Sequence, residues 1–192
     1  MNYLAHILFS GEDKDIQLGN FIGDAVKGSY DHYPERIREG IALHRRMDQY
    51  ADGHPAVREA VLLLRPDFGR YSGVLTDIFF DHFLAVNFER YTSKSLQRFA
   101  WGFYWNLIRH YAILPPRIKG FLWHFVITNR LCRYGSLNGI RESLSIMTKY
   151  RNFVVDPDKA VIFVKDRYTV FNDSAVTFFD SYKDCILNKA TR

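Results

Sequence analysis

Apolar residues recur at intervals of three and four through most of this chain, which is the spacing of one helix face. The run from 15 to 27 shows this pattern, with apolar residues at Ile16, Leu18, Phe21, Ile22, Ala25 and Val26. Prolines and glycines divide the pattern into segments, because proline favours the first turn of a helix and disrupts later turns. We therefore predict helices over 15–27, 34–52, 55–66, 71–91, 93–111, 115–135 and 136–149.

The C-terminal segment fits two kinds of secondary structure. Residues 160–171 (AVIFVKDRYTVF) are rich in β-branched and aromatic side chains, which also suit a strand. A strand needs a partner strand, and the rest of the sequence reads as helices, so we predict a helix from about 157 to 188. Because connections look short and no repeat stands out, the sequence predicts one all-α domain, a helical bundle over residues 1–192.

Composition and charge narrow the class of protein. The 192 residues are 47% hydrophobic, which is enough for a sizeable core, and the net charge of +5 favours an acidic or polyanionic partner. The two cysteines, Cys132 and Cys185, are too few for a disulfide framework and too far apart for a zinc motif. The N-terminus lacks the pattern of a signal peptide, and no uncharged run reaches the ~20 residues that cross a bilayer. We expect a cytoplasmic protein.

Two short motifs place candidate metal ligands one helical turn apart. His44 precedes Asp48 in LHRRMD, and Asp77 precedes Asp81 in LTDIFFDHF, where His82 follows at once. Residues four apart share a helix face, so each motif presents its ligands together. Imidazole and carboxylate groups suit a divalent ion that activates water. The motifs therefore point to hydrolysis.

Three acidic residues, Asp24, Asp77 and Asp81, stand among apolar residues, which is unusual for a carboxylate. Asp24 follows LGNFIG, and Asp77 and Asp81 are surrounded by Ile, Leu and Phe. A buried carboxylate must be paired, hydrogen-bonded or bound to a metal, because an isolated buried charge is very costly. Ion pairs offer an alternative, since basic residues are available at Lys27, Arg45, Arg46 and Arg70. We favour the metal site, because several acids and histidines gather in the first half of the chain.

The other histidines and the glycines carry less information. His6 can be a ligand or a core histidine, and His54 a ligand or a turn residue. We discount His32 and His110 as exposed, and we expect His124 to pack in an aromatic helix. Gly19 and Gly23 lie four apart in LGNFIGD, which lets another backbone approach that helix closely and is no nucleotide-binding fingerprint.

The order of motifs resembles a known family. The motifs are MNYLAHILFS at the start, GNFIGDAVKG at 19–28, GIALHRRMDQYADGHP at 40–55 and RYSGVLTDIFFDHFLA at 70–85. Together they are similar to the acyl carrier protein phosphodiesterases, also called acyl carrier protein hydrolases. The likeness covers residues 1 to about 90, and beyond that it rests on an LP at Leu114–Pro115 and a weaker NRLCRYG at 129–135.

The resemblance implies an all-helical enzyme related to the HD-domain metal phosphohydrolases. Such enzymes use manganese or a similar divalent ion, with magnesium or iron as alternatives. They hydrolyse the phosphodiester that joins 4′-phosphopantetheine to a serine of holo acyl carrier protein, and so release the apo protein. The family pattern carries onto Asp24, His44, Asp48, Asp77, Asp81 and His82, and from weaker matches onto His6 and His54.

We expect the following roles on this basis. The metal ligands are Asp24, His44, Asp77, Asp81, His82 and His6, and the catalytic residues are Asp48, Lys27 and Arg45. Lys27 follows Asp24 by three residues, on the same helix face, and Arg45 neighbours His44, so both can hold the phosphate. The expected partner is acyl carrier protein, which is small and strongly acidic and suits a basic enzyme, with no nucleic acid and no membrane. Two alternatives stay open: hydrolysis of a nucleotide or other small phosphodiester, and a non-enzymatic helical binder of an acidic partner.

Overall fold

The computed structural model describes residues 3–150 and 153–190, and every regular element in these ranges is helical. The described chain divides into two compact units. The first unit comprises residues 3–50 and 88–132, and the second comprises residues 51–87 and 133–190. The all-α prediction is confirmed, and the strand alternative for residues 160–171 is wrong. The prediction of one domain over 1–192 and the relation to the HD-domain fold stay predictions.

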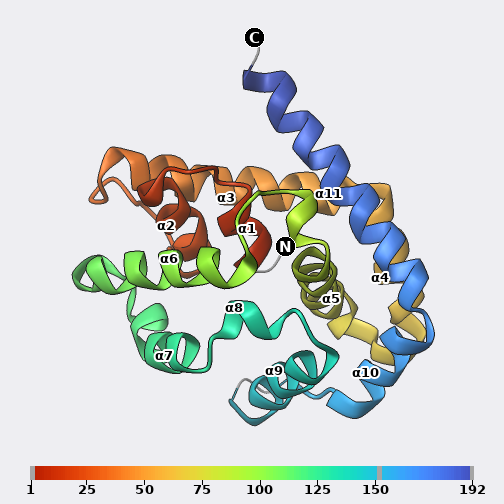
Figure 1. Cartoon of the computed structure of the whole chain (residues 1–192). Coiled ribbons are helices and arrows are strands. Elements are labelled where there is room, and N and C mark those ends of the chain that lie inside the picture. The colour runs from red at the N-terminus through yellow and green to blue at the C-terminus, as the bar shows by residue number, and fades with distance from the viewer. Residues whose placement is uncertain (1–2, 151–152, 191–192) are drawn as a thin grey trace. The chain divides into compact units, whose positions relative to one another are not determined.

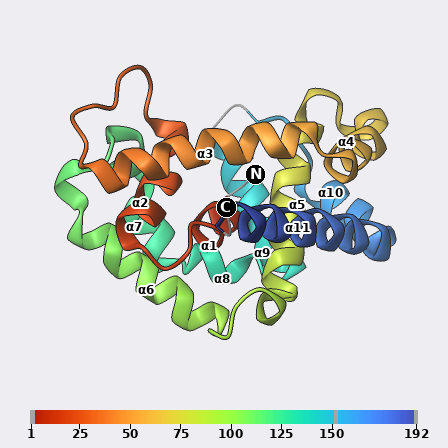
Figure 2. The same ribbon diagram turned by 90° about the horizontal axis from the view of Figure 1, so that it is seen from above.

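The first unit is built from helices at both ends of its sequence. They are α1 (Tyr3–Leu8), α2 (Lys14–Ile22), the 3-10 turn η1 (Gly23–Ala25), α3 (Glu35–Gly53, its last three residues counted with the second unit), η3 (Phe88–Arg90), α6 (Leu96–Arg109), η4 (Tyr111–Ile113), α7 (Pro116–Ile127) and α8 (Arg130–Arg133, which ends at the unit boundary). Helix α2 lies between α3 and α6 in both views of the ribbon (Figures 1 and 2).

Two glycines let α2 and α3 touch backbone to backbone. A Cβ atom at Gly19 would lie 2.1 Å from the carbonyl oxygen of Ile37, and one at Gly40 would lie 2.3 Å from that of Ile16. Any side chain at either position would force the helices apart. The prediction of a close backbone approach at Gly19 is confirmed, and Gly40 supplies the matching position on α3.

The core of the first unit is aromatic. The ring of Phe21 on α2 lies 5.0 Å from that of Phe103 on α6 and 5.4 Å from that of Phe125 on α7, centroid to centroid. Tyr104 of α6 also meets Phe125, at 5.7 Å. Edge-to-face and tilted aromatic pairs of this kind bury large areas and fix relative orientation. This cluster therefore holds α2, α6 and α7 together.

The second unit contains α4 (Pro55–Phe68), η2 (Gly69–Tyr71), α5 (Ser72–Val86), α9 (Leu137–Tyr150), α10 (Pro157–Asp166) and α11 (Tyr168–Ala190). Helix α5 packs against α4, α9 and α11, and it is buried along most of its length. Its Phe79 and Phe80 meet Phe171 and Phe178 of α11 with ring centroids 5.6 and 5.8 Å apart. This packing explains why the α5 sequence is apolar nearly all round.

The helix boundaries differ from the sequence prediction at identifiable places. Helix α1 was not predicted, because six residues are too short for a periodic pattern. Helix α2 ends at Ile22 rather than at 27, where the chain tightens into η1. The predicted C-terminal helix is two helices, with a break at Arg167 (φ −119°, ψ 28°). None of the described helices is long and apolar enough to cross a membrane.

Candidate metal centre

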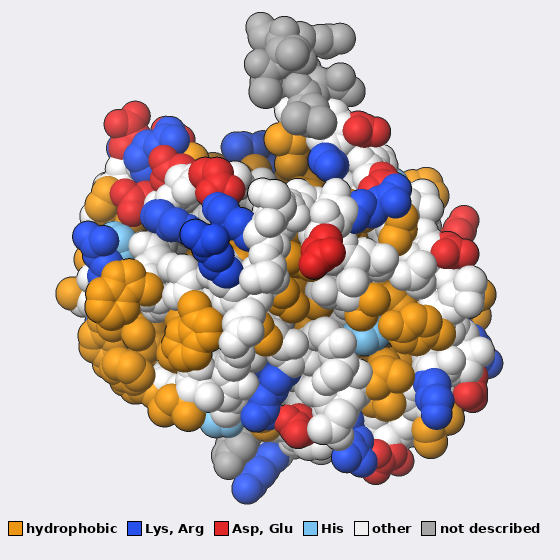
Figure 3. Space-filling model, viewed as in Figure 1, with side chains coloured by type: hydrophobic (Ala, Val, Ile, Leu, Met, Phe, Trp, Pro, Cys, Tyr) orange, Lys and Arg blue, Asp and Glu red, His pale blue; other side chains and the backbone are white. Residues whose placement is uncertain are grey.

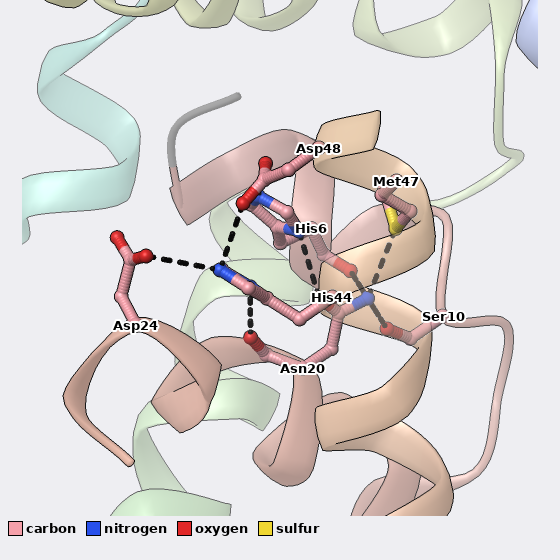
Figure 4. Close-up of polar contacts among 7 residues, drawn as sticks. All are labelled: His6, Ser10, Asn20, Asp24, His44, Met47 and Asp48. Atoms are coloured by element: carbon pink, nitrogen blue, oxygen red, sulfur yellow. Dashed lines mark hydrogen bonds and ion pairs between the residues drawn. The ribbon is translucent and has the colours of Figure 1, made fainter. Parts of the chain in front are cut away.

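Two helices of the first unit bring one group of potential ligands together. His6 comes from α1, and His44 and Asp48 come from one face of α3, one turn apart. Their ligand atoms all lie within 4.8 Å of one another, and no other group of three such residues does so in the part of the chain that the structure describes. Figure 4 shows them converging beside Asp24. The sequence prediction of a shared face for His44 and Asp48 is confirmed.

The distances suit a single ion. Asp48 Oδ1 lies 3.2 Å from His6 Nε2, and Asp48 Oδ2 lies 3.1 Å from His44 Nε2. The Oδ1 atom of Asp24 lies 3.2 Å from the same His44 nitrogen. Ligand atoms about 2.1 Å from one ion, at right angles to each other, are about 3.0 Å apart. The group therefore has the spacing that a divalent ion needs.

Asn20 of α2 fixes the tautomers of both histidines. Its side-chain nitrogen donates to the carbonyl oxygen of His6 (2.9 Å), so its side-chain oxygen accepts from His6 Nδ1 (2.7 Å). Its backbone carbonyl accepts from His44 Nδ1 at 2.8 Å. With Nδ1 donating on both rings, Nε2 is the atom that faces Asp48, and on a neutral ring this atom carries the lone pair that binds a metal. Metal-binding histidines commonly have this outer hydrogen bond.

His6 supplies the test of fit for a metal. Its ring is 2% exposed and stacks on that of His44 at 4.0 Å between centroids. Its Nε2 atom makes no hydrogen bond, although Asp48 Oδ1 is within ion-pair distance. A buried polar atom without a hydrogen bond is costly, and a cation at this point would satisfy it. The donor set of two imidazoles and the Asp48 carboxylate, with the Asp24 carboxylate beside His44, fits manganese, iron or zinc.

The pKa values show which groups carry charge in the metal-free protein. Burial lowers the pKa of His6, so this ring is neutral at pH 7. Burial alone would also lower the pKa of His44, but hydrogen bonds to Asp24 and Asp48 outweigh it and raise the value to about 9. The hydrogen bond to His44 lowers the pKa of Asp24. Burial would raise the pKa of Asp48, but its contacts with the His44 and His6 rings lower it. A proton on His44 thus holds the two carboxylates together, and a metal ion must displace it.

The raised pKa of His44 predicts how stability depends on pH. A histidine whose pKa is higher in the folded state stabilises the protein fully below its unfolded value of 6.5, and the contribution is lost as pH rises through about 9. We expect the free energy of unfolding of the metal-free protein to fall over this window, by on the order of 3 kcal/mol at most, and its melting temperature to fall with it. Thermal melts from pH 6 to 10 after chelation check this. The His44→Gln variant should lack this fall, and an equal fall in both proteins would contradict the pKa assignment.

Asp24 differs from the sequence prediction. It lies in η1 rather than within a helix, and its side chain is 65% exposed rather than buried. Its carboxylate nevertheless points to His44 (Figure 4). Arg117, in the first turn of α7, donates from Nη1 to the backbone oxygen of Asp24 at 3.2 Å. The centre is thus buried at His6 and opens to solvent at Asp24, beside an arginine.

The structure describes the surroundings of Lys27 and Arg45, the two cations assigned to the phosphate, and their assignment stays a prediction. The chain leaves helical geometry at Val26 (ψ 107°), so the argument that Lys27 and Asp24 share a helix face is wrong. Lys27 is exposed. Arg45 is exposed as well, and its guanidinium carbon lies 4.8 Å from the ring centroid of Tyr30. Arg117, which was not predicted, is a basic side chain that donates a hydrogen bond to the site, at the backbone oxygen of Asp24.

Three predicted ligands belong to the second unit. Asp81 and His82 are buried in α5, and Asp77 is half-buried. The Nδ1 atom of His82 donates to the carbonyl oxygen of Tyr134 (2.7 Å), and its Nε2 lies 3.2 Å from the hydroxyl of Tyr168. Burial lowers the pKa of His82, so it is a neutral ring whose Nε2 accepts from that tyrosine. The assignment of these three residues as metal ligands stays a prediction.

The remaining histidines have other partners. His54 precedes α4, and its Nδ1 accepts from the backbone N–H of Ala56, which is the role of a helix cap. His32 is exposed, as predicted, whereas His110 is half-buried and pairs with Asp15 across 3.5 Å. His124 is exposed, so the prediction that it packs among aromatic rings is wrong.

Sequence reasoning missed Asn20 and Arg117. Asn20 is fully buried within the apolar run LGNFIG, so the argument applied to Asp24 fits it better. No local pattern identifies Arg117, because it reaches the site only through the packing of α7. A third residue, Ser10, supports the arrangement, since its hydroxyl accepts from Asn20 and donates to the carbonyl oxygen of His6.

Comparisons with known proteins agree with the motif order. The sequence profile described as acyl carrier protein phosphodiesterase matches residues 1–182. A protein of that name from Yersinia pestis is 28% identical over 181 residues, 93% of this chain and 94% of the relative. Relatives of the same name from Photorhabdus laumondii and Salmonella agona are each 31% identical, over 78% and 79% of this chain and 76% and 79% of their own. No solved structure matches the chain.

Proposed function

Because the chain belongs to the acyl carrier protein phosphodiesterase family, we propose that it hydrolyses the phosphodiester between 4′-phosphopantetheine and a serine of acyl carrier protein. In this reaction water adds to phosphorus, the bond from phosphorus to the serine oxygen breaks, and that oxygen takes up a proton. The products are 4′-phosphopantetheine and the apo carrier protein. The observation that carries the assignment of the site is the convergence of His6, His44 and Asp48, with Asp24 beside His44 and with His6 Nε2 left without a hydrogen bond.

We assign His6, His44 and Asp48 as metal ligands, with Asp24 completing the group on the exposed side. This differs from the sequence-based assignment, which gave Asp48 a catalytic role. Asp48 bridges both histidines, which is the position of a ligand. A divalent ion in this group supplies a Lewis acid for the phosphoryl oxygens and a bound water of lowered pKa. Manganese remains the expected ion.

The chain's own residues supply the other requirements of phosphodiester hydrolysis. The transition state carries extra negative charge on the phosphoryl oxygens, which a guanidinium group can offset. Arg117 lies beside Asp24, where the centre opens to solvent, so it is placed to bind the phosphate. Asp24 is ionised, exposed and next to this position, so its carboxylate is placed to accept a proton from the attacking water.

Arg117 gives a prediction that separates the cations near the site. Arg117→Ala is expected to lower kcat for carrier protein by about 10²-fold, the usual effect of losing one group that stabilises the transition-state charge. Lys27→Ala should change kcat less, because that side chain follows an extended residue and has left the helix face. Steady-state kinetics with saturating Mn²⁺ measure both variants. If kcat falls in Lys27→Ala and not in Arg117→Ala, Lys27 rather than Arg117 binds the phosphate.

The function is tested by mass spectrometry of holo acyl carrier protein incubated with the protein and Mn²⁺. We expect loss of the phosphopantetheine mass and appearance of the apo protein. A protein that cleaves a small phosphodiester but leaves holo carrier protein intact would favour the nucleotide or small-diester alternative. A protein that cleaves neither, and takes up no divalent ion, would favour the non-enzymatic binder.

A further inference from the structure

All three tryptophans of the chain are exposed on one region of the first unit. Trp101 and Trp105 on α6 are 51% and 64% exposed, and Trp123 on α7 is 53% exposed. Ile127, one turn beyond Trp123, is 79% exposed. Tryptophan is normally largely buried, and monomeric proteins rarely expose apolar groups together. Figure 3 shows the hydrophobic side chains gathered over α6 and α7, at the left of the view.

On each helix these residues lie on one exposed side because their spacing follows the helical repeat. On α6 the exposed positions Arg98, Trp101, Trp105 and Arg109 are three and four apart, so they share one side. On α7 the exposed positions Arg117, Gly120, Trp123 and Ile127 do the same. The opposite sides of both helices are joined by Tyr104 and Phe125 in the core. We call Arg98, Trp101, Trp105, Arg109, Trp123 and Ile127 the α6–α7 face.

The charge of this region has one sign. Residues 91–132 contain six Lys or Arg side chains and no Asp or Glu, against a net charge of +5 for the whole chain. Two acids from elsewhere in the first unit pair with basic groups of this segment, Asp15 with His110 and Glu12 with Lys94. The tryptophans therefore lie in a field that attracts an anionic partner. Tryptophan and arginine are also the residues that most often dominate binding energy at protein interfaces.

Two glycines on the same helices support contact with another chain. Gly102 and Gly120 are exposed within α6 and α7, and a Cβ atom at either would meet nothing within 4 Å. Glycine is unfavourable inside a helix, and nothing in the described structure needs it at these positions. Because glycine has no side chain, each of these positions leaves a shallow depression in the helix surface next to a tryptophan, where the backbone of a partner can come close.

We propose that the α6–α7 face docks the acidic carrier protein, and this inference rests on the proposed function. The face is connected to the metal centre, because Arg117 at the start of α7 bonds to the carbonyl oxygen of Asp24. A carrier protein bound along α7 would therefore present its modified serine near the open side of the centre. The tryptophans supply apolar contact, while Arg98 and Arg109 select an acidic surface.

The test compares the kinetics and binding of variants in the α6–α7 face with those of control variants at exposed residues on α10. Trp105→Ala and the double variant Arg98→Glu/Arg109→Glu are expected to raise KM for holo carrier protein at least ten-fold, with kcat within two-fold. They should weaken binding of apo carrier protein equally, measured by calorimetry. The controls Ile162→Ala and Lys165→Glu replace exposed apolar and basic residues of the second unit and should leave both values unchanged. Circular dichroism confirms folding of each variant.

The outcomes distinguish this inference from the proposed function. If the wild type releases phosphopantetheine and the face variants keep a normal KM, the docking site is wrong and the function stands. If the wild type neither cleaves holo carrier protein nor binds the apo form, both are wrong. If the variants lose binding to vesicles of anionic lipid and keep their affinity for carrier protein, the face is a membrane contact and the proposal is overturned.

Discussion

Replacing Asp48 with asparagine is expected to reduce kcat/KM for carrier protein by more than about 100-fold. Loss of a residue that only orients a metal ligand costs about 10–100-fold, and Asp48 is proposed to be a ligand itself. Asp48 is the group that both histidine nitrogens face, at 3.2 and 3.1 Å. Asparagine keeps the shape of the side chain but removes the negative charge that a divalent ion requires. The helical content should be unchanged by circular dichroism, so that the loss is assigned to the site.

Two variants calibrate this result. Asn20→Ala removes the hydrogen bond that orients His6 but removes no proposed ligand. Its kcat/KM should therefore fall by about 10–100-fold. His110→Ala should keep nearly full activity, because His110 pairs with Asp15 and not with the cluster. Near-normal activity of Asp48→Asn would remove Asp48 from the site.

A single methyl group at Gly23 is expected to cost about 10²-fold in activity, although it adds no charge and removes no ligand. The Cβ atom of an alanine there would lie 2.4 Å from Cγ of His44 and 2.6 Å from its Cβ. The backbone of Gly23 is right-handed helical (φ −49°, ψ −44°), so alanine suits its conformation and only the contact is unfavourable. The His44 ring must move away, and its bonds to Asp24 and Asn20 lengthen.

The matched control is Gly73→Ala on α5, where a Cβ atom meets nothing within 4 Å. This variant should keep its activity and melt at the same or a slightly higher temperature, since alanine favours a helix. Kinetics and Mn²⁺ affinity of Gly23→Ala measure the effect. Unchanged values for Gly23→Ala would show that the His44 ring has room to spare, against the packing described for η1.

The helices were largely predictable because their signals are local. Apolar residues spaced three and four apart are a pattern that spans only one or two turns. Pro55 and Pro116 mark the first turns of α4 and α7 in the same local way. The errors arose where tertiary packing decides. Residues 23–25 tighten into η1 where Gly23 lies against the ring of His44, and the break at Arg167 separates helices that make different contacts.

The site was predictable in part for the same reason. His44 and Asp48 share a face of one helix, so their pairing follows from the sequence alone. His6 joins them only because α1 packs on α2, whose Asn20 bonds to its ring. Arg117 lies 93 residues after Asp24 and reaches it through the packing of α7 on the aromatic core. Contacts across such separations have no signature in local spacing.

The central claim is that His6, His44 and Asp48 hold a divalent ion, and Mn²⁺ binding measures this without reference to activity. Titration followed by the electron paramagnetic resonance signal of free Mn²⁺ gives the number of sites and their affinity. We predict at least one site in the wild type that is absent in His44→Ala and in Asp48→Asn and retained in His110→Ala. Equal Mn²⁺ binding by the wild type and the Asp48→Asn and His44→Ala variants would contradict the account.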